Sequence, residues 1–229
     1  MATAGGDDAV MRVDGDAEKE EEEAPPPPSL ERLLDEYEFR LNQAIEENFS
    51  TPAQMSFFER PAEVAPGLFL GNMAHAQNVK LLQSLGISGV VNCAFDADTG
   101  LLTGPDFYPS RFAFLGFPAL DAEDYPILEA HLPALLAFMG EHGRGRRVLI
   151  HCMAGMNRSA ALLAALLLHQ KRMYVEDVVA VLAQKRGSVL SNTGFVRQLA
   201  KLAFELDLLE KPGLAAGAGW RAGDASGAA

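Results

Sequence analysis

A cysteine, a glycine and an arginine stand close together in one short stretch of the chain. Cys152, Gly155 and Arg158 lie between an aliphatic run at 148–150 and a longer apolar run that begins at Ser159. The first run predicts a short buried strand and the second a buried helix. A turn from strand to helix directs backbone N–H groups into one concavity, and the helix start adds positive potential. The stretch therefore predicts an anion-binding loop with a cysteine at its floor.

Such a loop suits nucleophilic chemistry on a phosphate group. Cysteines beside N–H dipoles and a guanidinium ionise readily, because these groups stabilise the thiolate. Arg158 offers a planar fork that fits two phosphoryl oxygens. A nucleophile and an anion clamp in one loop predict a reaction at a phosphate or a similar oxyanion. The alternative is a buried, inert cysteine with an arginine that pairs elsewhere.

The stretch at 151–159 resembles the signature loop of a known enzyme family. It reads His-Cys-x-x-Gly-x-x-Arg-Ser between a strand and a helix, which is similar to the cysteine-dependent protein phosphatases and fits their dual-specificity branch best. Leu-Phe-Leu-Gly at 68–71 and Leu-Gly-Ile-x-x-Val-Val-Asn at 85–92 extend the likeness upstream. The resemblance implies a small, atypical dual-specificity phosphatase. Such an enzyme hydrolyses phosphotyrosine and phosphoserine/threonine in proteins through a cysteinyl-phosphate.

The chemistry and the resemblance together suggest a role for each residue of the loop. Cys152 is the expected nucleophile, and Ser159 is expected to donate its hydroxyl to the sulfur, with helix capping as a second role. His151 is expected to orient the loop rather than to transfer a proton. Gly155 is expected to let the backbone bend inward where a side chain would clash. The phosphate oxygens are expected to bind the Arg158 guanidinium and the N–H groups of Met153, Ala154, Gly155, Met156, Asn157 and Arg158.

The leaving group also needs a proton, and its donor must come from outside the loop. Asp121 follows an apolar run at 112–117 that predicts a strand, so its loop should lie at the same edge of the sheet as Cys152. Dual-specificity phosphatases place their acid on such a loop at a similar spacing. Asp121 is therefore the expected general acid, and afterwards the base for the hydrolytic water. Asp124 and then Glu123 are its rivals.

Asn157 departs from the dual-specificity pattern, in which many members have serine at this place. Gly-x-Asn-Arg also occurs in related metal-independent RNA 5′-tri/diphosphatases, so an RNA substrate stays an alternative. The acidic balance of the chain, the lack of a Lys/Arg-rich track and the presence of Asp121 argue against nucleic acid. Phosphoinositide relatives tend to carry lysines in the loop, where this chain has Met153 and Met156. A lipid substrate is therefore disfavoured. A phosphate-binding adaptor with little turnover is the third hypothesis, disfavoured because the cysteine and the arginine are both present.

Strands that alternate with helices must position these residues. The pattern predicts an α/β fold with a mostly parallel central sheet of about five strands flanked by helices, similar to the protein tyrosine phosphatases. Two short strands joined by a Pro-Gly turn are expected within 64–71, and further strands at 87–93, 112–117 and 148–150. Helices are expected at 72–84, 128–142, 174–186 and 193–208, besides the one after Ser159, with Asn192 as the cap of the last. A surface loop is expected at 94–110.

Length and composition suggest one domain with extensions. The chain has 229 residues and a net charge of −12, much of it in an acidic, proline-rich segment at 1–28 that should be disordered. An amphipathic helical extension is expected at 29–58, with Ser29 as its N-cap. Its apolar stripe either packs on the domain or offers a contact surface to a partner, and the oligomeric state is left open. The phosphatase domain is expected at 59–210 and a flexible Gly/Ala tail at 211–229.

The remaining expectations concern cysteines, partners and location. Of the two cysteines, Cys93 is expected to be a small core residue, although it could pair with Cys152 under oxidation. No metal-ligand cluster is visible, and the proposed chemistry needs neither metal nor cofactor. No secretory signal or membrane-spanning run is seen, so the chain is expected in the cytoplasm, the nucleus or both. The expected partner is a phosphoprotein substrate, with no membrane and no nucleic acid.

Overall fold

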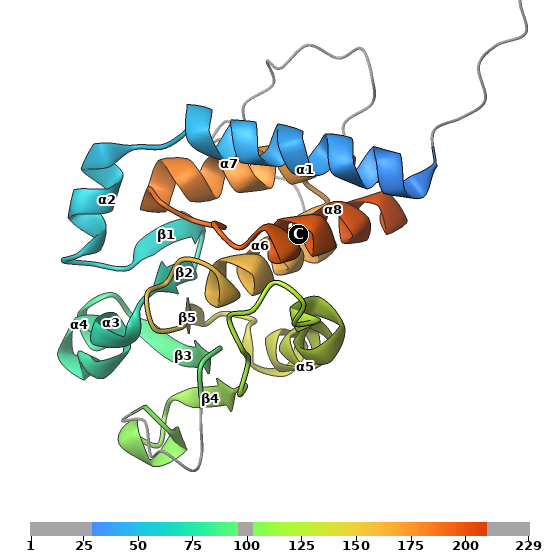
Figure 1. The fold of residues 1–229 in the computed structure, drawn as a ribbon. Coiled ribbons are helices and arrows are strands. Elements are labelled where there is room, and N and C mark those ends of the chain that lie inside the picture. The colour runs from blue at the N-terminus through green and yellow to red at the C-terminus, as the bar shows by residue number, and fades with distance from the viewer. Residues whose placement is uncertain (1–28, 96–102, 210–229) are drawn as a thin grey trace, which may run out of the picture.

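A twisted five-stranded sheet lies at the centre of the structure, a computed structural model that describes residues 29–95 and 103–209 (Figure 1). The expected tails at 1–28 and 211–229 lie outside the described residues. The strand order is β1-β2-β5-β3-β4, with β2, β5, β3 and β4 parallel and β1 antiparallel at the edge. The predicted α/β fold is confirmed. The strands are β1 Ala62–Ala65, β2 Leu68–Gly71, β3 Ile87–Asn92, β4 Ala113–Gly116 and β5 Arg147–His151.

Strand β5 occupies the middle of the sheet because its side chains are aliphatic on both faces. Val148 and Ile150 are buried in the larger hydrophobic cluster, whereas Leu149 is buried in a smaller cluster on the opposite face. The larger cluster is covered by α5 Ile127–His142, α6 Arg158–Lys171, α7 Val175–Arg186 and α8 Thr193–Glu205. The smaller one is covered by α3 Met73–Gln77 and α4 Val79–Ser84. Helices thus bury both faces, as a parallel sheet requires.

The segment after β2 differs from the prediction of one helix at 72–84. Asn78 has φ −88° and ψ 75°, which ends α3, and its side chain accepts a hydrogen bond from Leu81 N and so caps α4. Asparagine competes for backbone groups in this way and favours caps over helix interiors. Of the predicted loop at 94–110, residues 96–102 lie outside the described residues, and the described part contains a short 3₁₀ helix, Pro105–Phe107. The predicted caps Ser29 and Asn192 are confirmed, since each accepts a backbone N–H of its own helix.

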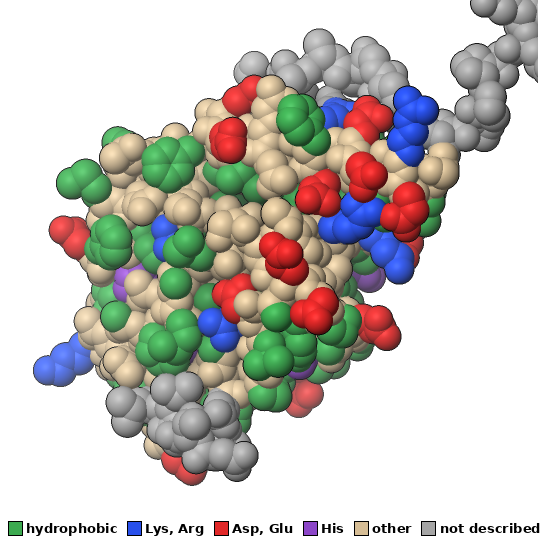
Figure 2. Space-filling view, in the orientation of Figure 1, with side chains coloured by type: hydrophobic (Ala, Val, Ile, Leu, Met, Phe, Trp, Pro, Cys, Tyr) green, Lys and Arg blue, Asp and Glu red, His purple; other side chains and the backbone are tan. Residues whose placement is uncertain are grey.

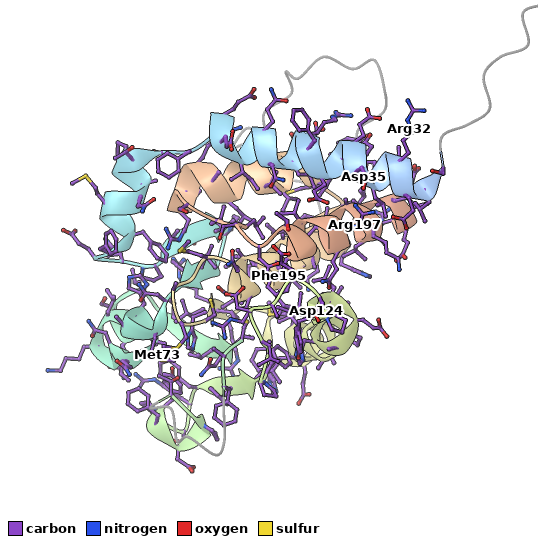
Figure 3. All side chains as sticks on the ribbon, viewed as in Figure 1. Arg32, Asp35, Met73, Asp124, Phe195 and Arg197 are labelled. Atoms are coloured by element: carbon purple, nitrogen blue, oxygen red, sulfur yellow. The ribbon has the colours of Figure 1, made fainter. Side chains whose placement is uncertain are left out.

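Two N-terminal helices lie over the last helices of the chain (Figure 1). Helix α1 spans Leu30–Glu47 and packs on α7 and α8, and α2 spans Thr51–Phe57 and packs on α7. The apolar stripe of α1 is buried, with Leu34, Tyr37 and Leu41 in the core. Arg197 of α8 adds ion pairs to Glu31, Asp35 and Glu38 of α1, and Figure 3 shows Asp35 beside Arg197. The stripe is therefore used for packing within the chain.

Candidate active site

The Cys152 loop joins the end of β5 to the start of α6, at the carboxyl edge of the sheet. Gly155 has φ +68°, and a Cβ atom there would lie 2.3 Å from the carbonyl oxygen of Gly71. Only glycine fits this conformation and this close approach to the end of β2. Cys152 is 1% exposed and lies at the bottom of the turn. The sheet and the helix thus hold the cysteine where the sequence places it, at the floor of a tight loop.

The carbonyl groups of the loop are bonded by groups outside it. Met153 O accepts from Met73 N at 3.1 Å, and Met156 O accepts from Leu190 N at 2.9 Å. The carbonyls between them, of residues 154 and 155, both accept from the Arg186 guanidinium. In a trans peptide the N–H points opposite to the carbonyl. Outward carbonyls at 153–156 therefore turn the N–H groups of 154–157 to the inner side, which forms an anion-binding nest.

Two donors converge on the Cys152 sulfur. Gly155 N and Ser159 Oγ each lie 3.2 Å from Sγ. Anionic acceptors form the stronger hydrogen bonds, so this arrangement serves a thiolate. Asn157 occupies the N-cap position of α6, Ser159 lies within the helix, and the Ser159 hydroxyl is directed to the sulfur. The alternative role of Ser159 as the helix cap is therefore wrong.

Arg158 extends from the start of α6 toward the loop that follows β4. Its Nη1 donates to Ala119 O at 3.2 Å, and its Nε lies 3.6 Å from Asp121 Oδ2. Within the described part of the chain, the buried Nε has no hydrogen-bond partner. An unsatisfied buried donor costs about 1–3 kcal/mol. An oxyanion in the nest would satisfy such a donor, which fits the expected clamp.

Asp121 is in contact with the Cys152 loop. Its Oδ1 accepts from Asn192 Nδ2 at 3.1 Å, and its Oδ2 accepts from Asn157 Nδ2 at 3.5 Å. The rival Glu123 bonds to Thr193 at the start of α8 instead. Asp124 is exposed on the same loop, beside α5 (Figure 3). Among the described residues, Asp121 is the carboxylate of the 121–124 stretch that hydrogen-bonds to the 152–158 loop and lies within ion-pair distance of it.

Asn157 and Asn192 form a polar bridge that sequence reasoning did not foresee. Asn157 Oδ1 accepts from Ser191 Oγ at 3.1 Å and from Asn192 N at 3.3 Å, while its amide donates to Asp121. Asn192 caps α8 through its Oδ1 and holds Asp121 through its Nδ2. The sequence identified Asn192 only as a cap. The second contact joins residues distant in sequence, so no local signal could reveal it.

His151 and Cys93 lie beneath the loop in the core. Burial lowers the pKa of His151 to about 4, so the ring is neutral near pH 7. Its Nδ1 lies 3.4 Å from Cys152 O, and its buried Nε2 has no hydrogen-bond partner among the described residues. Cys93 is buried, its N donates to His151 O at 2.7 Å, and burial followed by the nearby Cys152 raises the pKa of its thiol. These features fit a supporting histidine and a core thiol. Pairing of Cys93 with Cys152 stays a prediction.

Arg186 is the site residue that the sequence analysis missed. It ends α7 and is 4% exposed, and its Nε and Nη2 donate to Gly155 O at 2.9 Å and to Ala154 O at 3.1 Å. Burial lowers its pKa to about 10, which leaves it charged near pH 7. A basic residue in the last turn of a helix is common because of the helix dipole. Its sequence position therefore gave no sign of this contact.

The family model for the dual specificity phosphatase catalytic domain matches residues 68–204. The chain belongs to this family. It is 30% identical to human dual specificity protein phosphatase 2 over 149 residues, which cover 65% of this chain and 45% of that protein. It is 30% identical to a Slingshot phosphatase homolog of Xenopus laevis, with 62% of this chain and 19% of that protein covered. The chain therefore spans less than half the length of these curated relatives.

Solved structures of this family share the fold. Human DUSP28 is 28% identical and superimposes with a TM-score of 0.57 over 64% of this chain and 95% of that chain. The human tyrosine phosphatase-like serine/threonine/tyrosine-interacting protein is 30% identical, with a TM-score of 0.55 over 64% and 97%. The resemblance noted from the signature loop is confirmed.

The described residues contain neither a membrane-spanning helix nor a group of metal-ligating side chains. No helix there is both long and apolar enough to cross a bilayer. No three or more His, Cys, Asp or Glu side chains at 29–95 or 103–209 are grouped as a metal site would need. On the face in Figure 2, Lys and Arg side chains are scattered among acidic ones and form no continuous track. That distribution offers little to a polyanion on this face.

Proposed function

We propose that this chain is a protein phosphatase that hydrolyses phosphotyrosine and phosphoserine or phosphothreonine through a cysteinyl-phosphate. One observation carries the proposal. The Cys152 sulfur accepts hydrogen bonds from Gly155 N and Ser159 Oγ inside a nest of N–H groups, and Asp121 contacts the same loop. These contacts support the proposed roles of Cys152 as nucleophile, the loop as anion clamp and Asp121 as proton donor.

In the first step the Cys152 thiolate attacks phosphorus. A sulfur lone pair forms the S–P bond, the ester P–O bond breaks, and its electron pair goes to the leaving oxygen. Asp121 gives that oxygen its proton. The inward N–H groups and the Arg158 guanidinium bind the three equatorial oxygens and stabilise their charge in the transition state. The tyrosine, serine or threonine side chain leaves as a neutral hydroxyl.

In the second step water hydrolyses the cysteinyl-phosphate. The Asp121 carboxylate takes a proton from the water, whose oxygen forms the new P–O bond while the S–P bond breaks. The electron pair of that bond returns to Cys152 as a thiolate. Ser159 Oγ, 3.2 Å from the sulfur, donates a hydrogen bond that stabilises the departing thiolate. Inorganic phosphate is released and the site is restored.

The contacts of Asn157 favour a protein substrate over RNA. Asparagine at this place suggested RNA 5′-tri/diphosphatases, but here its side chain bonds Asp121, Ser191 and the backbone of Asn192. These bonds account for asparagine without an RNA ligand. The adaptor hypothesis is weaker, because cysteine, arginine, serine and aspartate are all present and in contact. One solved relative is nevertheless called a phosphatase-like interacting protein, so turnover must be measured.

The test compares substrates and trapped intermediates. We expect wild type to hydrolyse an aryl phosphate and phosphopeptides, and Cys152→Ser to abolish turnover. Asp121→Ala, quenched in acid during turnover and analysed by mass spectrometry, should carry phosphate on Cys152. Wild-type activity in Cys152→Ser would overturn the mechanism. Faster phosphate release from triphosphate-ended RNA or phosphoinositides than from phosphopeptides would overturn the substrate class.

A further inference from the structure

The last residue of α2 lies against the phosphate-binding loop, although it is outside the 68–204 stretch matched by the family model. Phe57 is 2% exposed, and its ring centroid is 3.8 Å from the guanidinium carbon of Arg186. We infer that Phe57 is a positioning residue of the active site, which acts through Arg186 on the backbone of the Cys152 loop. The inference rests on the proposed phosphatase function and adds Phe57, one residue of α2, to the site.

Arg186 sets the direction of two peptide groups. Its Nη2 donates to Ala154 O, and the N–H of that same peptide, on Gly155, donates to Cys152 Sγ. Its Nε donates to Gly155 O, so the N–H of Met156 is turned to the inner side of the loop. A shift of the guanidinium would rotate both peptides. It would therefore misplace a donor to the nucleophile and a donor to the phosphate together.

The Arg186 guanidinium lies over the face of the Phe57 ring, and this contact restricts its orientation. An aromatic face attracts a guanidinium and limits its tilt, an effect that strengthens in a desolvated site. The ring also borders the loop directly, because a Cβ on Gly155 would lie 2.9 Å from Phe57 Cζ. On another side it packs edge-on to His75 with ring centroids 4.9 Å apart. Phe57 thus packs against Arg186, Gly155 and His75 of α3.

Two residues N-terminal to Phe57, Asn48 and Gln54, are hydrogen-bonded to the segment that carries Arg186. Gln54 Oε1 accepts from Ser188 N at 3.2 Å, and Asn48 Oδ1 accepts from Gln184 Nε2 at 2.6 Å. Gly187 has φ +90°, and a Cβ there would lie 2.6 Å from Gln54 Cβ. Asn48, at the end of α1, thus contacts α7 before Arg186, and Gln54 of α2 contacts the residues just after it. The N-terminal segment therefore contacts both the Arg186 guanidinium, through Phe57, and the backbone and side chains that flank Arg186.

The chain offers matched controls for Phe57. Phe58 is the next residue and is 71% exposed, so Phe58→Ala removes the same side chain without touching the site. Leu41 of α1 is buried in the core, so Leu41→Ala weakens the packing of the same extension without a contact to the loop. The variants under test are Phe57→Ala and Phe57→Leu, the second of which keeps an apolar side chain but removes the ring.

The measurements are kcat and KM on an aryl phosphate, the Kd of tungstate and the melting temperature, all on the full chain. We expect Phe57→Ala to lower kcat and weaken tungstate binding by about 10- to 100-fold, because a loop displaced by about 1 Å can cost 10² in rate. Phe57→Leu should lower kcat and weaken tungstate binding by about half as much on a logarithmic scale, that is by about 3- to 10-fold. Phe58→Ala should change nothing, and Leu41→Ala should lower the melting temperature while kcat stays within about twofold.

A double-mutant cycle tests the route through Arg186. Arg186→Lys keeps a cation but lacks the fork that binds two carbonyls. In that background, Phe57→Ala should change kcat by less than about twofold, because the contact it supports is already lost. Additive losses would overturn the route. Wild-type kcat and tungstate affinity in folded Phe57→Leu, or an equal loss in Leu41→Ala, would overturn the positioning role.

A failure of the proposed phosphatase function can be distinguished from a failure of the positioning role of Phe57. A wild-type chain that binds tungstate but hydrolyses no phosphate would overturn the phosphatase proposal. In that case the tungstate Kd of Phe57→Leu against wild type still decides the positioning role. Unchanged affinity overturns it, and a loss of about threefold or more supports it.

Discussion

Replacing Gly155 by alanine tests the geometry on which the site depends. The added Cβ would lie 2.3 Å from Gly71 O, whereas ordinary contact begins at 3.4 Å, so the loop and the end of β2 must separate by about 1 Å. A displacement of this size at a reacting group costs about 100-fold in rate, or about 2.7 kcal/mol of transition-state stabilisation. The φ of +68° adds about 1–2 kcal/mol of backbone strain to the folded state.

Gly145 provides the matched control. Its φ is +71°, yet nothing lies within 4 Å of a Cβ built there, and it precedes β5 at the opposite end of the strand from Cys152. Gly145→Ala therefore shares the backbone strain of Gly155→Ala without the clash. Both variants should lose a few degrees of melting temperature. Only Gly155→Ala should lose about 100-fold in kcat on an aryl phosphate and bind tungstate measurably more weakly. Equal kcat values in the two variants would refute the close approach of the loop to β2.

Three further predictions concern single side chains. Asp121→Ala should lower kcat/KM, which reports the first step, at least tenfold for a poor leaving group such as phenol and much less for an activated aryl ester, whereas Asp124→Ala should stay within about twofold; the reverse pattern would make Asp124 the acid. Ser159→Ala should slow dephosphorylation more than phosphorylation, so stopped-flow traces should show a burst of the first product absent from wild type. His151 is buried with its pKa lowered to about 4. The unfolded state therefore binds more protons below about pH 6.5, and stability should fall from there toward pH 4 by up to about 1.4 kcal/mol per unit. His151→Asn should flatten that part of the urea-midpoint profile, and an unchanged slope would contradict the assignment.

Much of the site could be predicted because it is local in sequence. The strand at 147–151, the glycine turn and the helix from Arg158 are encoded by aliphatic residues, a residue tolerant of positive φ and a run of good helix formers. Each signal depends on neighbours a few positions away. The same holds for the caps Ser29 and Asn192. The error at 72–84 was also local, since Asn78 can end one helix and start another.

The sequence by itself determined the family and the α/β class, and it predicted Cys152 as the nucleophile and Arg158 as the anion clamp. The tertiary structure alone decided that Asp121 rather than Glu123 contacts the loop, that Asn192 holds it, and that Arg186 and Phe57 support the loop backbone. The physical reason is that periodicity and turn chemistry report only local backbone preference and burial. Which buried arginine meets which carbonyl depends on how separate helices pack on the sheet, and no short stretch of sequence contains that information.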